Sequence, residues 1–184
     1  MQNLQKNTNI WCDMDGVIAI YEPDGFCGEN PPFLIPNSHY FRNCIPDLRI
    51  IQALQLLNDI YHIPIKIISN VHESLKQEHH NDKYDWLKQH TPFINIDKNY
   101  HTIINSKATY VEKLKRKALT KSDILISDYN GDLKKWSESG GTGIKYANGI
   151  NNPHSYDGLY IPEKYTSKQI ANQIIDIIYE IENK

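Results

Sequence analysis

Two aspartates, Asp13 and Asp15, follow the short apolar run Ile10–Cys12 and precede a glycine, Gly16. In an extended chain, side chains two positions apart point to the same face, so both carboxylates can face one small site. Two carboxylates placed this way repel each other, and a bound divalent cation such as Mg2+ compensates their charge. The pattern predicts phosphoryl transfer, in which one aspartate attacks phosphorus, the other handles the leaving-group proton and the metal holds phosphate oxygens.

Two other interpretations of this segment have to be weighed. An EF-hand calcium loop that begins at Asp13 would need a glycine at position 18 and a glutamate at position 24, where the chain has Ile18 and Asp24. Taken alone, an Asp-x-Asp-Gly sequence is also compatible with an ordinary turn. The catalytic interpretation therefore depends on what the rest of the chain supplies.

Polar residues also follow two later apolar runs. Ser69 and Asn70 come directly after the run 63–68, and Asp128 comes shortly after the run 124–126. Ligands of a doubly wound sheet bind in the crevice beyond the carboxyl ends of its strands, and Asp13 also falls at such an end. A serine after a strand is also a common turn residue, so its functional interpretation rests on this shared position.

A phosphate beside an attacking carboxylate needs a cation to offset the charge. Ser106 is predicted to cap a helix, which places Lys107 at a helix N-terminus, where backbone N–H groups also favour anions. Lysines are common on helix surfaces, and Lys121 competes for the role. The charged run 113–117 is typical of a solvated helix face.

Predicted strands and helices alternate along the chain, which indicates a parallel sheet covered on both faces. The predicted fold class is α/β, a doubly wound, Rossmann-like parallel sheet. The 184 residues are enough for one well-cored domain and too few for two. Strands are expected at 10–12, 63–68, 93–96, 124–126 and 144–146, and helices from about Pro46, over 76–90, after Ser106, over 133–139 and from about Ser167.

The segment Asp13–Val17 resembles the first motif of the haloacid dehalogenase (HAD) superfamily. The resemblance implies a HAD-like fold in a single domain spanning residues 1–184. It also implies that Asp13 becomes a covalent aspartyl-phosphate and that Asp15 acts as the general acid and base. The stretch at about 21–45, rich in proline, glycine and aromatic residues, is too long for a simple connection and corresponds to a small cap inserted after the first strand.

Later residues resemble the second and third motifs of the same superfamily. Ser69 matches the residue whose hydroxyl binds a phosphate oxygen, and Asn70 is expected to assist it. Lys107 matches the phosphate-binding lysine of the third motif, because it begins the helix just before the acidic strand. Lys121 is the alternative.

Asp128 resembles the metal-binding acid of the fourth motif. The resemblance implies that Mg2+ is held by Asp13, Asp128 and the backbone carbonyl of Asp15. Many relatives carry two consecutive acids here, whereas this chain has Ser127 in the first position. Asp132 is the candidate for the second acid, and it is equally compatible with simply starting the next helix.

Further stretches resemble bacterial and phage HAD proteins that are similar to 5′(3′)-deoxyribonucleotidases, namely 40–43, 127–129, 140–145 and 148–151. This likeness implies a Mg2+-dependent phosphomonoester hydrolase that acts on (deoxy)nucleoside monophosphates. Tyr21, Phe41 and Arg42 of the insertion are candidates to stack on a base or pair a phosphate. The aromatic residues are also compatible with a small core of the insertion itself.

Other functions remain open at this point. Ser127 motivates a phosphate- or nucleotide-binding protein with weakened catalysis, and a phosphatase of another small metabolite would share the same motifs. An interaction subunit on the same scaffold would need a large exposed apolar patch. Measured turnover with Mg2+ would distinguish an enzyme from a phosphate- or nucleotide-binding protein with weakened catalysis.

The composition limits the classes of partner that we expect this protein to bind. The formal net charge of −2 gives no electrostatic case for nucleic-acid or membrane binding. Apolar runs fall well short of the ~20 residues of a membrane span, and the polar start does not resemble a signal peptide. The three cysteines lack metal-ligand spacing, which favours reduced thiols. We expect a cytoplasmic protein whose partner is a small phosphorylated substrate.

Overall fold

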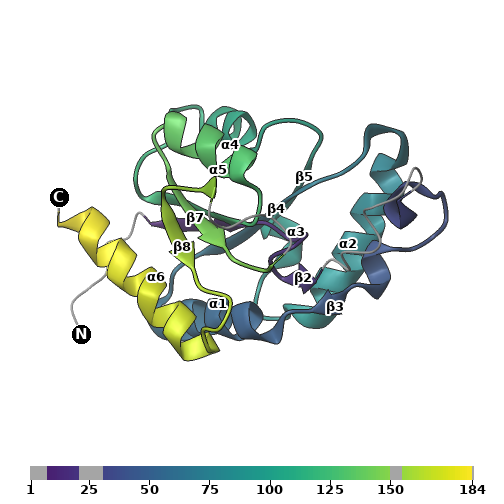
Figure 1. The fold of residues 1–184 in the computed structure, drawn as a ribbon. Coiled ribbons are helices and arrows are strands. Elements are labelled where there is room, and N and C mark those ends of the chain that lie inside the picture. The colour runs from purple at the N-terminus through teal and green to yellow at the C-terminus, as the bar shows by residue number, and fades with distance from the viewer. Residues whose placement is uncertain (1–7, 21–30, 150–154, 184) are drawn as a thin grey trace.

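The computed structural model describes residues 8–20, 31–149 and 155–183. Within these ranges, six parallel strands form one sheet in the order β5-β4-β1-β6-β7-β8 (Figure 1). Their bounds are β1 (Asn9–Cys12), β4 (Ile65–Asn70), β5 (Tyr100–Ile103), β6 (Asp123–Ser127), β7 (Thr142–Tyr146) and β8 (Leu159–Ile161). The predicted α/β class with a doubly wound parallel sheet is confirmed.

Helices cover both faces of the sheet (Figure 1). Their bounds are α1 (Leu48–Tyr61), α2 (Lys76–His90), α3 (Ile96–Asn99), α4 (Lys107–Lys115), α5 (Asn130–Glu138) and α6 (Ser167–Glu182). The side chains of β1 alternate between two cores: Ile10 and Cys12 join the core under α1 and α6, and Trp11 joins the core under α4 and α5. β1 is therefore buried on both faces, as its continuous apolar run predicts.

The strand order reverses beside β1. From β1 the chain builds outward through β4 and β5, and it then returns to add β6, β7 and β8 on the other side. Cys12 pairs with Ile126, and the backbone N–H of Asp13 donates to the carbonyl of Ile126 at 2.9 Å. The ends of β1 and β6 thus meet at the switch point, where doubly wound sheets form their binding crevice.

The segment between β1 and α1 forms the insertion. It contains the antiparallel strands β2 (Ala19–Ile20) and β3 (Ile45–Pro46) and the short 3-10 turns Pro32–Leu34 and Phe41–Asn43. The rings of Phe33, Tyr40 and Phe41 contact one another, with centroids 5.2–6.3 Å apart. Side chains of α2 contact the insertion: His79 packs edge-on against Phe41, with centroids 4.8 Å apart, and Trp86 donates to the carbonyl of Cys44 at 2.7 Å.

The strand predicted at 93–96 is wrong. Ile96 begins the short helix α3, and the edge strand is β5, four residues later. Ile94 and Ile96 alternate as in a strand, but both are buried from a turn and a helix start. An alternation of only two apolar residues does not distinguish these cases.

The helix predicted from about Pro46 begins two residues later, at Leu48. Pro46 pairs with Ala19 in the small sheet, and Asp47 caps the helix by accepting from the backbone N–H of Arg49 at 3.0 Å. The sequence does not predict β8, because this strand has only three residues and two of them are exposed. The cap at Ser106 and the start of the last helix at Ser167 lie where they are expected.

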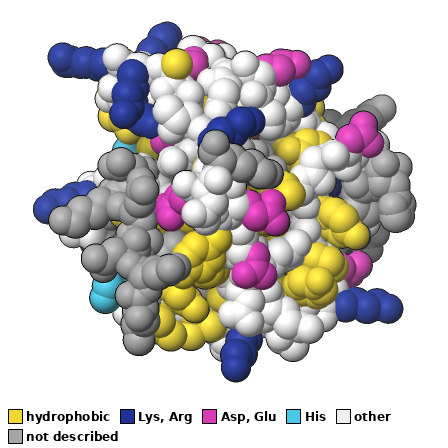
Figure 2. Space-filling view, turned by 90° about the vertical axis from the view of Figure 1, so that its left-hand side faces the viewer, with side chains coloured by type: hydrophobic (Ala, Val, Ile, Leu, Met, Phe, Trp, Pro, Cys, Tyr) yellow, Lys and Arg dark blue, Asp and Glu magenta, His cyan; other side chains and the backbone are white. Residues whose placement is uncertain are grey.

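On the face drawn in Figure 2, lysine and arginine side chains are dispersed and acidic side chains lie among them. None of the helices in the described part of the chain combines the length and apolar character that a membrane crossing requires.

Candidate active site

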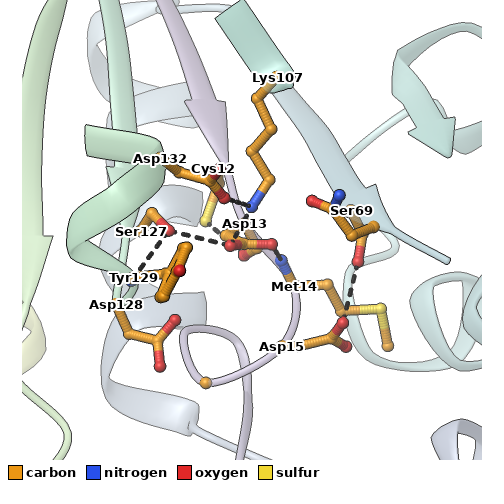
Figure 3. Close-up of polar contacts among 12 residues, drawn as sticks. Cys12, Asp13, Met14, Asp15, Ser69, Lys107, Ser127, Asp128, Tyr129 and Asp132 are labelled. Carbon is orange, nitrogen blue, oxygen red and sulfur yellow. Dashed lines mark hydrogen bonds and ion pairs between the residues drawn. The ribbon is translucent and has the colours of Figure 1, made fainter. Parts of the chain in front are cut away.

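Asp13 lies at the centre of the polar cluster beyond β1 and β6 (Figure 3). Its Oδ2 accepts hydrogen bonds from the ammonium group of Lys107 and from Ser127 Oγ, the latter at 2.9 Å. Its Oδ1 accepts from the backbone N–H of Met14 at 2.9 Å. The carboxylate is buried, so these donors fix its orientation at the end of the strand.

Lys107 approaches Asp13 from the first residue of α4. Ser106 caps this helix by accepting from the backbone N–H of Thr109 at 3.4 Å, which sets where the helix begins. The Lys107 ammonium also donates to Asp132 Oδ2 at 2.7 Å. Burial alone lowers the pKa of this lysine, but the two carboxylates outweigh burial and raise its pKa, so Lys107 is a cation at neutral pH.

Asp132 does not start α5, which begins at Asn130 with Tyr129 as its N-cap; it lies in the first turn, and its carboxylate belongs to the cluster. Ser127 is completely buried between Asp13 and Tyr129, and its Oγ accepts a hydrogen bond from the backbone N–H of Tyr129 at 3.2 Å. The position at which the family resemblance leads us to expect a second acid is therefore filled here by a hydroxyl that donates to the central carboxylate.

Asp15 points to the other side of Asp13 (Figure 3). Its Oδ2 accepts from Ser69 Oγ at 3.2 Å and from the ammonium group of Lys83, which lies in α2. Burial is the main influence on the pKa of Asp15 and raises it, the charge of Asp13 raises it further, and Lys83 lowers it in part. The net effect is a raised pKa, so the folded protein favours the protonated form of Asp15 more than water does.

Asp128 is buried at the end of β6, next to the turn that follows Asp15. Its Oδ2 accepts from the amide of Asn148 at 3.0 Å, and the same amide donates to the carbonyl of Gly16 at 2.6 Å. Gly16 has a φ of +73°, and a Cβ there would lie 2.2 Å from Asp128 Oδ2. The glycine therefore permits the close approach of the first turn to the Asp128 carboxylate.

This arrangement fits a hard divalent cation. The carboxylates of Asp13 and Asp128, buried at the ends of neighbouring strands, are oxygen donors of the kind that Mg2+ prefers, and the family resemblance would add the backbone carbonyl of Asp15. Four carboxylates gather at this edge of the sheet, and the two ammonium groups of Lys83 and Lys107 contact three of them. The buried ammonium of Lys145, which contacts the backbone carbonyl of Asp128, offsets part of the remaining charge, and a divalent cation beside Asp13 and Asp128 would balance the rest.

Lys145 is a further buried lysine that the sequence analysis does not identify. Its ammonium donates to the carbonyl of Asp128 at 2.5 Å and to Asn130 Oδ1 at 2.6 Å. Burial lowers its pKa, and Asp128 opposes that effect in part. Its position in the run Ile144-Lys145-Tyr146, a charge inside an inner strand, is the signal that could have identified it.

The other predicted residues lie as follows. Asn70 donates from its side chain to the carbonyl of Asn105, so it holds the loop before α4. Lys121 precedes β6 at the opposite edge of the sheet, and its side chain is exposed. Arg42 pairs with Asp82 at 3.2 Å and with Asp85 at 2.7 Å.

Of the other two candidate substrate contacts, Phe41 is buried in the aromatic cluster of the insertion, which supports the alternative that these rings form a local core. Tyr21 lies outside the described residues. A contact of either residue with substrate stays a prediction.

Comparison with known proteins places the fold. No family model and no curated protein matches the sequence. Among solved structures, D,D-heptose 1,7-bisphosphate phosphatase from B. bronchiseptica, crystallised with magnesium and phosphate, has a TM-score of 0.58 at 14% identity and covers 92% of this chain and 98% of its own.

Two further structures agree. The corresponding phosphatase from Burkholderia thailandensis has a TM-score of 0.60 at 10% identity, covering 91% of this chain and 98% of its own. A HAD-superfamily hydrolase from Ehrlichia chaffeensis has a TM-score of 0.52 at 18% identity, covering 95% and 99%. At these identities the likeness shows the fold, and the expected HAD-like architecture is confirmed.

Proposed function

We propose that this protein is a Mg2+-dependent phosphomonoester hydrolase that acts through an aspartyl-phosphate on Asp13. The observation that carries the proposal is the surroundings of Asp13: a buried carboxylate at the switch point, held by Lys107 and Ser127 on one oxygen and by a backbone N–H on the other. A fixed carboxylate next to a cation is what attack on a phosphate dianion requires.

In the first step, Asp13 attacks phosphorus and the bond from phosphorus to the ester oxygen breaks. Asp15 gives a proton to that oxygen, so the product leaves as an alcohol. Lys107 stabilises the negative charge on the phosphoryl oxygens, because two of its N–H groups hold Asp13 and Asp132 and the third has no acceptor among the described residues.

In the second step, Asp15 takes a proton from a water molecule that attacks the aspartyl-phosphate. The bond between phosphorus and Asp13 breaks, and orthophosphate leaves with the carboxylate restored. A bound Mg2+, held by Asp13, Asp128 and the carbonyl of Asp15, would supply charge neutralisation for the phosphoryl oxygens.

Nucleoside monophosphates, deoxyribonucleotides first, are the substrate class that we propose. Support comes from the sequence resemblance and from the insertion that follows the catalytic turn, in which Phe41 is buried and Phe33 and Tyr40 are partly exposed. Stacking on an aromatic side chain is worth roughly 1–3 kcal/mol per base and tolerates different bases. The sugar bisphosphate named for two structural neighbours is the competing class.

The test measures phosphate release by the purified protein, with Mg2+ and with EDTA. The panel holds p-nitrophenyl phosphate, deoxyribonucleoside and ribonucleoside 5′-monophosphates, sugar phosphates and a sugar bisphosphate. We expect Mg2+-dependent turnover with the highest kcat/KM on nucleotides. A much higher kcat/KM on a sugar phosphate contradicts the substrate class and leaves the phosphatase assignment standing.

Phosphate release combined with a binding measurement on the same nucleotides separates an enzyme from a binding protein. Tight binding of a nucleotide by calorimetry without any release of phosphate favours a binding protein with weakened catalysis. The hydrogen bond from Ser127 to Asp13 speaks for the enzyme, because the residue that replaces the usual acid still supports the attacking carboxylate.

A further inference from the structure

Lys83 lies in the interior of α2, and its side chain is completely buried. Its ammonium group donates to Asp15 Oδ2, to Ser69 Oγ at 2.8 Å and to the backbone carbonyl of Asn70 at 2.7 Å. An ammonium has three N–H donors. All three are used inside the protein, so Lys83 has none left for a substrate phosphate.

The insertion closes the remaining side of this ammonium. Nζ of Lys83 lies 4.0 Å from the centroid of the Phe41 ring, which is within the range of a cation–π contact. Phe41 is itself buried and packs edge-on against His79 of α2, with centroids 4.8 Å apart. Lys83 is therefore enclosed between the insertion and the sheet, where its role must be exerted through its neighbours.

The two carboxylate oxygens of Asp15 have different surroundings. Oδ2 accepts from Lys83 and Ser69. Oδ1 is buried and has no hydrogen-bond partner among the described residues. Unpaired buried acceptors are rare and costly in folded proteins, and a ligand that donates a proton removes that cost.

We propose that Lys83 is a positioning residue that, together with Ser69, fixes Asp15 by Oδ2 and so presents Oδ1 for proton transfer. This inference rests on the proposed function and names the oxygen that carries the proton. Oδ1 gives its proton to the ester oxygen as the P–O bond breaks. Oδ1 then takes a proton from water as the water oxygen bonds to phosphorus and the bond to Asp13 breaks.

The dependence on the leaving group tests this role. p-Nitrophenolate leaves without much help from an acid, whereas the alkoxide of a nucleoside needs a proton. We expect Lys83→Met to lower kcat/KM for a deoxynucleoside 5′-monophosphate by about 100-fold, the usual scale of general acid catalysis. The fall for p-nitrophenyl phosphate should be about tenfold smaller. The value of kcat/KM reports the steps up to release of the phenolate, and that release needs little help from an acid.

A purely structural role for Lys83 would lower both values by the same factor. Equal losses, or no loss, overturn the proposal. Lys76→Met is the matched control, because Lys76 is an exposed lysine at the start of the same helix, and it should leave both values unchanged. Should Lys83→Met fail to fold, Lys83→Gln, which retains a donor, is expected to show the same inequality to a smaller degree.

Crystal structures decide the proposal even when no phosphate ester is hydrolysed, an outcome that would refute only the proposed function. In metal-free wild type, Asp15 Oδ2 should stay with Lys83 and Ser69, and in Lys83→Met the carboxylate should turn away from Ser69. An unmoved carboxylate overturns the positioning role. In wild type soaked with Mg2+ and orthovanadate, Oδ1 should face the vanadate, and Oδ2 facing it would refute the oxygen assignment.

Discussion

Lys107 and Lys83 are two buried lysines that serve the two aspartates of the same turn, and they do so from opposite faces of the sheet. Lys107 comes from α4, which packs on the core around Trp11, and contacts Asp13. Lys83 comes from α2, whose apolar residues join the core around Ile10 and Cys12, and contacts Asp15. Each aspartate therefore has a cation of its own.

The two ammonium groups differ in what remains for a ligand. Lys107 shares its charge between the carboxylates of Asp13 and Asp132 and keeps one N–H without an acceptor among the described residues. Lys83 uses all three N–H groups on protein oxygens under the ring of Phe41. The comparison teaches that a lysine with a spare donor can bind substrate, whereas a saturated one can only orient a neighbour.

The largest expected effect comes from Asp13 itself. Asp13→Asn should lower kcat on the order of a thousandfold or more, because an amide cannot replace the attacking carboxylate. The fold should persist, since the single Asn oxygen can take the place of Oδ2 and accept from Lys107 and Ser127, with loss of the hydrogen bond from the Met14 N–H to Oδ1. Steady-state phosphate release and circular dichroism check both points, and activity within tenfold of wild type would refute the nucleophile assignment.

Asp15→Asn separates the two aspartates. It should slow turnover severely, yet a reactive aryl phosphate should still phosphorylate Asp13, so phosphorylated protein accumulates. Acid quench followed by intact-mass measurement detects the added phosphoryl group. Absence of that mass in both wild type and Asp15→Asn would contradict the covalent route.

Lys107→Ala should cost about 2–4 kcal/mol of transition-state stabilisation, the range of a preorganised electrostatic contact. In contrast to Lys83→Met, the loss in kcat/KM should be equal for aryl and alkyl phosphates, because phosphoryl charge develops with both. Lys121→Ala is the matched control and should be near neutral. A larger loss for Lys121→Ala than for Lys107→Ala would show that the third motif is misplaced.

Ser127→Asp changes the environment of Asp13 without touching either lysine. An aspartate at this buried position would place a second carboxylate where a hydroxyl now donates to Asp13 at 2.9 Å. Repulsion between the two carboxylates should lower the Tm in the absence of metal, and Mg2+ should restore the Tm. The Mg2+ concentration that gives half-maximal activity should be lower than in wild type. An unchanged Mg2+ dependence would indicate that Asp132 or water already fills the role of the missing acid.

The smallest effect concerns a buried carboxylate outside the site. Burial, the main influence on Asp47, raises its pKa, but hydrogen bonds from Arg49 and Tyr146 outweigh burial and leave the pKa lowered. The ionised form is then favoured in the folded state, so its stabilisation is present above the ordinary aspartate pKa and is lost as pH falls through the lowered value. Asp47→Ala should reduce the free energy of unfolding at pH 7 by about 1–2 kcal/mol, the scale of a lost helix cap.

This difference between Asp47→Ala and wild type should shrink below about pH 4, where an ordinary aspartate is protonated. Urea denaturation at several pH values measures it, with Asp176→Ala, an exposed aspartate of α6, as control. A difference that grows on acidification would show that the sign of the pKa shift is wrong. Unlike Lys83→Met, neither variant should alter the leaving-group dependence.

The sequence by itself determined the fold class and the edge of the sheet where the site lies. Apolar runs that end in polar residues indicate where buried strands end, and parallel strands bring those ends together, so the shared edge of Asp13, Ser69 and Asp128 could be predicted from local pattern, whereas their roles stay predictions from the resemblance. The cap residue Ser106 likewise fixed where α4 begins, and with it the first-turn position of Lys107.

Only the tertiary structure decided which cation serves which carboxylate. Lys83 lies in a helix rich in polar residues, where a lysine usually points to solvent, and its partner Asp15 is 68 positions away. The one local signal is that Lys83 shares a helix face with the buried residues His79 and Trp86. Tertiary packing brings together two segments that are far apart in the sequence. No local pattern therefore specifies the contact between Lys83 and Asp15.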